Sequence, residues 1–430
     1  MSLTALVFVL AFGTGCLLAF VRHPIYGLMT YVGVFYIHPP SRWWGQGLLI
    51  DVRWSLLAAA VTLLAMLIRK PSEPTAPVLR SAAFWGFLLL VAWIGLQSFW
   101  ALDPEAHADQ LSYYLKFILV ILMVCRCIDT EQHLRYFLWT HVAGCFYLGW
   151  LASTSYAGGR LDGVGGPGIN EANAAALQMV TGILVAGSLF LAARWRIRAV
   201  LILMIPFMVN GLVTTISRSG FLAAAVGGVI YNLFTPSRYR PAVRLLSVLA
   251  LVLFAAVTND IYWERIGTIK HKGEQVEGVD TGGGRLEIIA AQWRMFEGRP
   301  YGCGHMCTSV LSPSHVEERF LSQGGRASHN TFMTMLVDHG VVGVAIYVLM
   351  LVWIFRSLRA IAGRLKGQEG FLPTFLPALA AVFAAITIGD LFVQYPKFEA
   401  RFWFISLLIV MLHLSQKGNV RSPGAANARQ

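Results

Sequence analysis

Two arginines lie in sequence contexts that suit the binding of an anion. Arg218 stands between two apolar runs in the segment Thr-Ile-Ser-Arg-Ser-Gly, residues 215–220, and Arg285 follows three glycines, residues 282–284. A guanidinium group is always charged, and its planar fork of N–H donors matches the oxygens of a phosphate. We interpret both arginines as candidate phosphate ligands. The plainer alternatives are an Arg218 side chain that reaches lipid headgroups and an Arg285 side chain exposed in a flexible loop.

A histidine occurs at the start of a later apolar run, in the segment Ser328-His329-Asn330-Thr331. Because imidazole titrates near neutral pH, His329 could accept a proton from an attacking hydroxyl group at a water-accessible surface. A structural histidine is the alternative, with Ser328 or Asn330 capping the helix that follows.

Two further groups of polar residues flank apolar runs. Arg160, Asn170, Glu171 and Asn173 surround the start of the run 172–193. These are ordinary residue types for a helix start, but a polar helix start that faces a cavity could also bind a sugar or a phosphate. The second group follows the next-to-last apolar run and could form a network on the surface: Asp390, Lys397, Glu399 and Arg401.

The sequence predicts neither a metal site nor a cofactor. The loops that carry these residues lack the paired Asp-rich motifs that hold a divalent ion. Cys303 and Cys307 offer too few ligands, too closely spaced, for a metal site, but they could form a disulfide in an oxidising compartment.

The composition indicates that membrane-spanning helices position these residues. Of the 430 residues, 56% are hydrophobic and 13% are charged, whereas soluble globular proteins carry about 25% charged residues. This argues against a soluble enzyme, a disordered chain and a nucleic-acid-binding protein. Thirteen apolar runs approach the length that spans a membrane. They are residues 3–21, 24–38, 55–68, 83–100, 111–126, 134–152, 172–193, 197–216, 219–234, 244–259, 331–355, 371–390 and 401–415.

The distribution of charge orients these runs. Because the first two could form one broken span, we expect about 12 transmembrane helices in an all-α polytopic membrane protein. The connections on one side hold 19 of the 34 basic residues but only 4 of the 22 acidic ones. Basic loops face the cytoplasm, so this side is predicted to be cytoplasmic. The net charge of +12 is then a signal of topology, and the candidate site residues lie on the opposite, outer side.

A long outer connection divides the predicted bundle. Residues 260–328 separate two apolar runs, and the segment 285–293 has a helical pattern. A connection of this length is usually functional or disordered, and we expect a small helical cap here. The predicted organisation is N-terminal transmembrane helices at 1–259, the cap at 260–328, C-terminal transmembrane helices at 329–415 and a cytoplasmic tail at 416–430.

The motif around His329 resembles that of the O-antigen ligase and polymerase superfamily of bacterial envelope proteins. The ligases carry His, then Asn, Ser or Gln, nine residues, Gly, two residues, and then Gly, Thr or Tyr. This chain has His329-Asn330, nine residues, Gly340, two valines and Gly343.

The arginines extend this resemblance. The ligases carry an Arg followed four residues later by Leu beside a span, which Arg218 and Leu222 match. They also carry an Arg in the long outer loop before the His motif, which Arg285 matches.

The resemblance implies a GT-C-like all-α bundle with a helical periplasmic cap in the bacterial inner membrane. The implied reaction transfers O-antigen polysaccharide from undecaprenyl pyrophosphate to lipid A–core oligosaccharide on the periplasmic face. We expect it to need no metal and to invert the anomeric carbon. The catalytic roles would fall to His329, Arg218 and Arg285. Contacts to the pyrophosphate or glycan would fall to Arg160, Arg326, Asn170 and Asn173.

Three alternatives stay open at this point. An O-antigen polymerase uses the same donor with a second lipid-linked glycan as acceptor, and a protein O-glycosylation ligase transfers the glycan to protein. A lipid-glycan transporter is more distant, because transporters place charges at mid-membrane and often show repeated halves. In this sequence the candidate charges gather at one face, and no internal repeat is visible.

Overall fold

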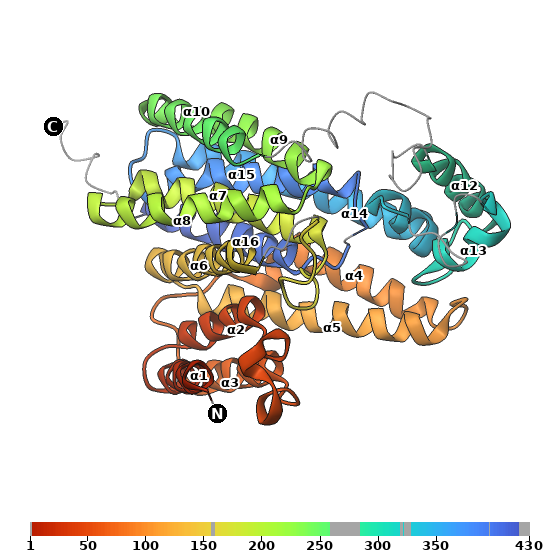
Figure 1. Cartoon of the computed structure of the whole chain (residues 1–430), viewed down its shortest axis with the longest axis horizontal. Coiled ribbons are helices and arrows are strands. Elements are labelled where there is room, and N and C mark those ends of the chain that lie inside the picture. Colours follow the sequence, from red (N-terminus) through yellow and green to blue (C-terminus); the bar gives the residue numbers. More distant parts are fainter. Residues whose placement is uncertain are drawn as a thin grey trace.

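The computed structural model describes residues 2–155, 160–258, 284–318, 321, 328–394 and 396–420. Throughout these residues the regular secondary structure is helical, without a strand. The long helices lie side by side along the long axis of the molecule, and α12 and α13 lie together at one end (Figure 1). Arg326 and the side chain of Arg285 lie outside the described residues.

Each of the thirteen apolar runs is a helix in the structure. These helices are α1 (Leu3–Val21), α2 (Ile25–Ile37), α3 (Trp54–Ile68), α4 (Ala82–Gln97), α5 (Pro104–Cys127), α6 (Glu131–Ser155), α7 (Ala172–Ala192), α8 (Trp195–Thr214), α9 (Arg218–Phe234), α10 (Arg240–Val257), α14 (Thr331–Leu365), α15 (Phe371–Asp390) and α16 (Glu399–Val420). Short 3-10 turns are η1 (Pro39–Ser41), η2 (Trp43–Gly45), η3 (Gly47–Leu49), η4 (Val78–Arg80) and η5 (Ser237–Tyr239).

The described residues of the long connection before α14 contain two helices. They are α12 (Gly284–Gly298) and α13 (Cys307–His315), and the segment 285–293, predicted to be helical, lies within α12. Helix α5 begins earlier than its apolar run because Asp103 accepts a hydrogen bond from the N–H of Ala106 and Pro104 occupies the first helical position.

Seven helical segments of the described chain are long and apolar enough to cross a membrane, which identifies a multi-pass membrane protein. They are α1, α5, α7, α8, the segment Ser237–Val257 that contains α10, α14 and α15. Helices α3 and α4 are apolar but shorter. The total of about 12 spans stays a prediction.

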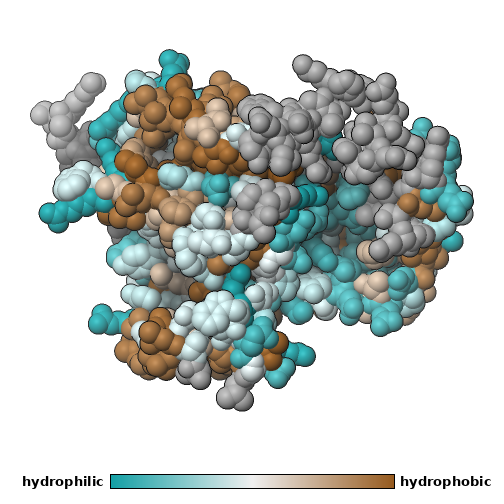
Figure 2. Space-filling view, in the orientation of Figure 1, coloured by the Kyte–Doolittle hydropathy of each residue, from teal (hydrophilic) through white to brown (hydrophobic). Residues whose placement is uncertain are grey.

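The outer surface of the bundle suits a lipid environment. Helix α10 is the clearest case, since Leu245 is 60% exposed and Leu251 is 66% exposed. Hydrophobic side chains gather over α9 and α10, whereas hydrophilic ones gather toward α14 and the end that carries α12 and α13 (Figure 2). A hydrophobic surface of this extent is costly in water but suits hydrocarbon.

The core lies around α7 and α15, which are the most deeply buried of the seven candidate spans. Small residues allow α9 to pack closely on both helices. A Cβ atom on Gly220 would lie 2.6 Å from the Cβ of Ala176 in α7, and one on Gly227 would lie 3.4 Å from the carbonyl oxygen of Ala381 in α15. Close packing through small residues is typical of helix association in membranes.

Candidate functional site

The starts of α7 and α9 meet at the predicted site. Ser217 caps α9 by accepting the N–H of Gly220 at 3.0 Å, and its hydroxyl donates to Oδ1 of Asn173 at 2.8 Å. Arg218 is therefore the first residue of α9 and follows a hydroxyl bound to the first turn of α7. Ile216, two residues before Arg218, has φ 48°, so the chain turns sharply between α8 and α9.

The loop that carries Arg160 and Asn170 covers these two helix starts. The N–H of Leu161 donates to the carbonyl of Thr214 at 3.0 Å, and the N–H of Gly163 donates to that of Asn170 at 2.7 Å. The carboxylate of Asp162 accepts the N–H of Ala172, the first residue of α7, at 2.8 Å. The loop is thus tied to the end of α8 and the start of α7.

Arg160 is half-buried in this loop, and its Nε atom is buried without a hydrogen-bond partner among the described residues. Burial raises the pKa of Glu171, while its hydrogen bond with Asn173 and the charge of Arg160 oppose that rise. Arg160 and Asn173 therefore both act on the carboxyl group of Glu171, close to the start of α7.

The turn that carries His329 is held by the connection between α15 and α16, residues 391–398. Asn330 caps α14 by accepting the N–H of Met333 at 3.0 Å, and its amide donates to the carbonyl of Leu391 at 3.3 Å. The hydroxyl of Thr331 donates to the carbonyl of Val393 at 2.7 Å, and the N–H of Ser328 donates to Gln394 at 3.1 Å. His329 is half-buried and has φ 48°.

Arg218 and the His329 turn lie at the same end of the bundle. Helices α9 and α15 pack against each other. The ion pair of Arg238 with Glu369 joins the residues just after α9 to those just before α15. The two helices are therefore antiparallel, so Arg218 at the start of α9 lies toward the end of α15. The residues after that end bind the His329 turn.

The motif glycines produce a kink in α14. Gly340 has φ 66°, and a Cβ atom there would lie 2.3 Å from the carbonyl carbon of Tyr301. Only glycine accepts this conformation together with so close a backbone. A Cβ atom on Gly343 would lie 2.3 Å from the Cβ of His339. The glycine pattern thus sets the direction of the short helix 331–339, which follows His329.

Sequence analysis missed a buried polar junction at this kink. The amide of Gln97, from α4, donates to the carbonyls of Tyr301 at 3.1 Å and Asp338 at 3.0 Å. Its oxygen accepts Nδ1–H of His339 at 2.7 Å. Gln97 and His339 are both fully buried. Gln97 and His339 are more than 200 residues apart in the chain, so no local sequence pattern predicts their contact.

Asp338 and His107 complete this junction. Backbone N–H groups of Met306, Cys307 and Thr308, at the start of α13, face the carboxyl group of Asp338. His107 accepts the N–H of His305 at 3.0 Å through Nδ1 and donates from Nε2 to a backbone carbonyl of α4. Burial lowers the pKa of His305, so its ring is neutral. The start of α13 is thus held to α4, α5 and α14.

Cys303 and Cys307 form the disulfide that their spacing allowed, and both are fully buried beside this junction. Arg285 lies in the first turn of α12. Its side chain, and the whole of Arg326, lie outside the described residues, so neither is placed relative to His329.

The interpretation of Asp390 and Arg401 as a surface network was wrong. Arg401 donates from Nη1 to Oδ2 of Asp390 at 2.7 Å and from Nη2 to Oδ1 at 2.6 Å, and both side chains are buried. Tyr347 of α14 also accepts from Arg401 at 2.9 Å. These bonds join α14, α15 and α16. They were not predicted from the sequence because a charged residue after an apolar run is ordinarily exposed.

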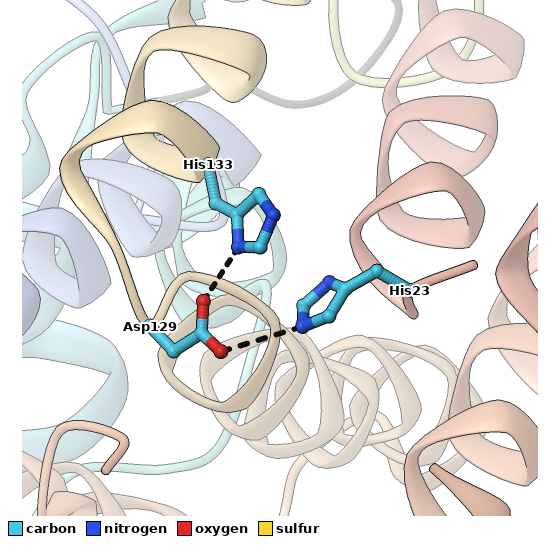
Figure 3. A group of neighbouring side chains, drawn as sticks. All are labelled: His23, Asp129 and His133. Atoms are coloured by element: carbon cyan, nitrogen blue, oxygen red, sulfur yellow. Dashed lines mark hydrogen bonds and ion pairs between the residues drawn. The ribbon is translucent and has the colours of Figure 1, made fainter. Parts of the chain in front are cut away.

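A second polar cluster lies at the other end of α5. His133 Nδ1 lies 2.5 Å from Asp129, and His23 Nε2 lies 3.4 Å from it, so both rings point at one carboxylate (Figure 3). The N–H groups of Ser72 and Glu73 also donate to Asp129, at 2.6 and 3.2 Å.

The geometry of this cluster fits a hydrogen-bonded carboxylate better than a metal site. His23 Nδ1 accepts the N–H of Ile25 at 3.1 Å, so a neutral ring carries its proton on Nε2, the atom that faces Asp129. A metal on Nε2 would move this proton to Nδ1, against a backbone donor, whereas metal-bound histidines normally donate from the second nitrogen.

Comparison with known families agrees with the motifs. Residues 203–348 match a family model described as O-antigen ligase, and this segment contains Arg218, Arg285, His329 and both motif glycines. No curated protein is significantly similar to the chain. Over this segment, about a third of the chain, the protein is similar to the O-antigen ligase family.

Proposed function

We propose that this protein transfers a glycan from a lipid-pyrophosphate donor, undecaprenyl pyrophosphate, to lipid A–core oligosaccharide on the periplasmic side of the inner membrane. The observation that carries this proposal is the placement of the family-matched residues. Arg218 and the His329 turn lie at one end of the bundle, at the starts of α9 and α14.

Stabilisation of the leaving group is the role proposed for the arginines. When the glycosyl bond breaks, its electron pair goes to the bridging oxygen of the pyrophosphate. Arg218, Arg285 and Arg160, with Arg326, would donate hydrogen bonds to this charge, while Asn170 and Asn173 would contact the glycan. One such donor is worth about 2.7–4 kcal/mol, or roughly a hundredfold or more in rate.

Activation of the acceptor is the role proposed for His329. The acceptor hydroxyl oxygen attacks the anomeric carbon, and its proton passes to the imidazole. General-base catalysis of this kind contributes about 100- to 10,000-fold. A single displacement inverts the anomeric carbon and needs no metal. A product with retained configuration would contradict this scheme.

Two features support the outer location of the site. The connections at the opposite ends of the helices carry the excess of basic residues that marks the cytoplasmic side. The disulfide between Cys303 and Cys307 lies on the site side of the molecule, and disulfides persist in oxidising compartments such as the periplasm.

The test is a reconstituted reaction. Purified protein is incubated with undecaprenyl-pyrophosphate glycan and rough lipopolysaccharide in the presence of a chelator. We expect a lipopolysaccharide band of higher mass, which His329→Ala and Arg218→Ala lose. Longer lipid-linked glycans in place of that band would indicate a polymerase. A glycosylated protein would indicate a protein ligase.

The base role of His329 has its own test. The wild-type pH–rate profile is expected to fall on the acidic side as the imidazole becomes protonated, and residual His329→Ala activity is expected to lack this limb. An identical acidic limb in both proteins would leave His329 as a phosphate ligand instead.

A further inference from the structure

A pair of lysines shares one tyrosine ring near the outer end of the bundle. The Nζ atom of Lys116 lies 4.7 Å from the centre of the Tyr113 ring, and that of Lys397 lies 5.1 Å from it. Lys397 also donates to Oε1 of Gln110 at 2.7 Å. We call Gln110, Tyr113, Lys116 and Lys397 the Tyr113 cluster. Three of its members lie on α5 and the fourth on the connection between α15 and α16.

No carboxylate of the described residues forms an ion pair with either lysine of the cluster, and this includes Glu105 and Asp109, the acids on the first turns of α5. The Gln110 amide oxygen is neutral. A bound anion would balance the charge of these two ammonium groups.

The cluster opens onto a surface that suits lipid. Tyr113 is 40% exposed, and the apolar neighbours Leu115 and Leu119 are 50% and 43% exposed. Lys116 is exposed on the same helix, within a candidate span. A lysine at such a position is costly unless its ammonium group reaches the headgroup region, where lipid phosphates lie.

The connection between α15 and α16 contributes residues both to the Tyr113 cluster and to the hydrogen bonds that hold the His329 turn. Leu391, Val393 and Gln394 accept the hydrogen bonds that hold Asn330, Thr331 and Ser328. Lys397 follows three residues after Gln394. Burial lowers the pKa of Lys397, and a nearby anion would raise it again. A ligand bound at the cluster would therefore lie beside the chain that positions His329.

We propose that the Tyr113 cluster binds the phosphate of an anionic lipid headgroup through the two ammonium groups. Resting on the proposed function, this lipid is the phosphorylated glycolipid acceptor, held so that its sugar lies near His329. The cluster then recognises the lipid part of the acceptor, whereas the arginines recognise the pyrophosphate of the donor.

Direct lipid binding tests the site without any catalytic assay. Purified protein is mixed with detergent micelles containing phosphatidic acid, and retained lipid is measured by native mass spectrometry. We expect the double substitution Lys116→Gln and Lys397→Gln to weaken retention about tenfold or more, the scale of losing hydrogen bonds to a charged group. The double substitution to Arg should retain the lipid, because the charge is kept.

Three controls sharpen this experiment. Lys70→Gln removes an exposed lysine between α3 and α4, at the opposite end, and should leave retention unchanged. Phosphatidylcholine should not be retained, because its headgroup has no net charge. Inorganic phosphate should not compete, since it lacks the lipid part. Competition by inorganic phosphate would overturn a lipid site in favour of an anion site, and full retention by the double Gln variant would overturn the proposal.

The link to the acceptor is tested separately. With the glycolipid acceptor, the double Gln variant should raise KM about tenfold at unchanged kcat, and an acceptor stripped of its phosphates should show equal KM in wild type and variant. A wild-type protein that retains phosphatidic acid but transfers no glycan would contradict the proposed function and leave the lipid site supported. Equal KM values for the phosphorylated acceptor would overturn its assignment as the ligand.

Discussion

At the scale of single residues, Arg218 is the clearest test of phosphate recognition. It lies at the first position of α9, where its side chain is half-buried and the preceding hydroxyl of Ser217 is bound to Asn173. Such a position allows a planar guanidinium to meet two phosphate oxygens at once, which a lysine cannot do.

Arg218→Lys keeps the charge but loses this bidentate geometry. We expect kcat/KM for glycan transfer to fall about tenfold to a hundredfold. Arg356→Lys is the matched control, because Arg356 is exposed near the other end of α14, and its activity should equal that of wild type. Full activity of Arg218→Lys would mean that charge alone matters and that bidentate binding is wrong.

At the scale of elements, the kink in α14 organises the outer end of the molecule. The short helix 331–339 begins at the His329 turn and ends at Gly340, where the backbone of residues 300–302 approaches too closely for any side chain. The hydrogen bond from the N–H of Val341 to Pro300 closes this contact. The direction of the His329 turn thus depends on a glycine eleven residues away.

Gly340→Ala should therefore disturb both stability and activity. The positive φ alone costs about 1–3 kcal/mol for a residue with a Cβ atom, and the clash with Tyr301 adds to it. Thermal unfolding in detergent measures the loss. Gly363→Ala, on the same helix with open space around it, should be neutral or slightly stabilising. An unchanged melting temperature for Gly340→Ala would exclude a rigid kink.

Asp338 makes a second prediction at this scale, because its carboxyl group faces the backbone N–H groups at the start of α13 from another helix. Replacement by Ala should cost about 0.5–2 kcal/mol and increase hydrogen exchange at the amides of residues 306–308. Asp338→Asn keeps an acceptor oxygen and should lose less. Unaltered exchange in Asp338→Ala would show that these amides find other partners.

The helices could be predicted from the sequence, but the polar contacts between them could not. Apolar runs become helices in a membrane whatever they pack against, because the backbone must satisfy its own hydrogen bonds. The cap at Asn330 is likewise local. The buried contacts of Gln97, His107 and Asp338, in contrast, are with residues far away in the sequence, so only the tertiary fold creates them. Arg401 is buried because it forms an ion pair with Asp390 of a neighbouring helix.

At the scale of the whole molecule, the cluster around Asp129 joins three connections at the basic end. Burial raises the pKa of this carboxyl, but hydrogen bonds from His133 and the N–H of Glu73, with the His23 ring close by, outweigh the burial, so the pKa lies well below its usual range. A carboxyl with a depressed pKa stabilises the fold at neutral pH. This stabilisation is lost progressively as the pH falls below the pKa of the same carboxyl in the unfolded chain.

Asp129→Asn should lower the free energy of unfolding by about 2 kcal/mol at pH 7, since an amide replaces a charged acceptor. The difference from wild type should narrow below about pH 4, where the carboxyl of the unfolded chain becomes protonated. Melting curves from pH 3 to 8 measure it. Glu131→Gln, which removes only an exposed pair with Arg135, is the control. A difference that stays constant with pH would contradict an ionised Asp129.

The junction beneath α13 holds the chain mainly through main-chain atoms. Gln97 donates to the carbonyls of Tyr301 and Asp338, and Trp100 donates to that of Gly302 at 3.1 Å. Every residue type offers these same atoms. Tyr301, whose side chain is 64% exposed, can therefore change without loosening the junction, whereas Gln97, which donates these bonds, and Gly340, which has no room for a Cβ atom, cannot.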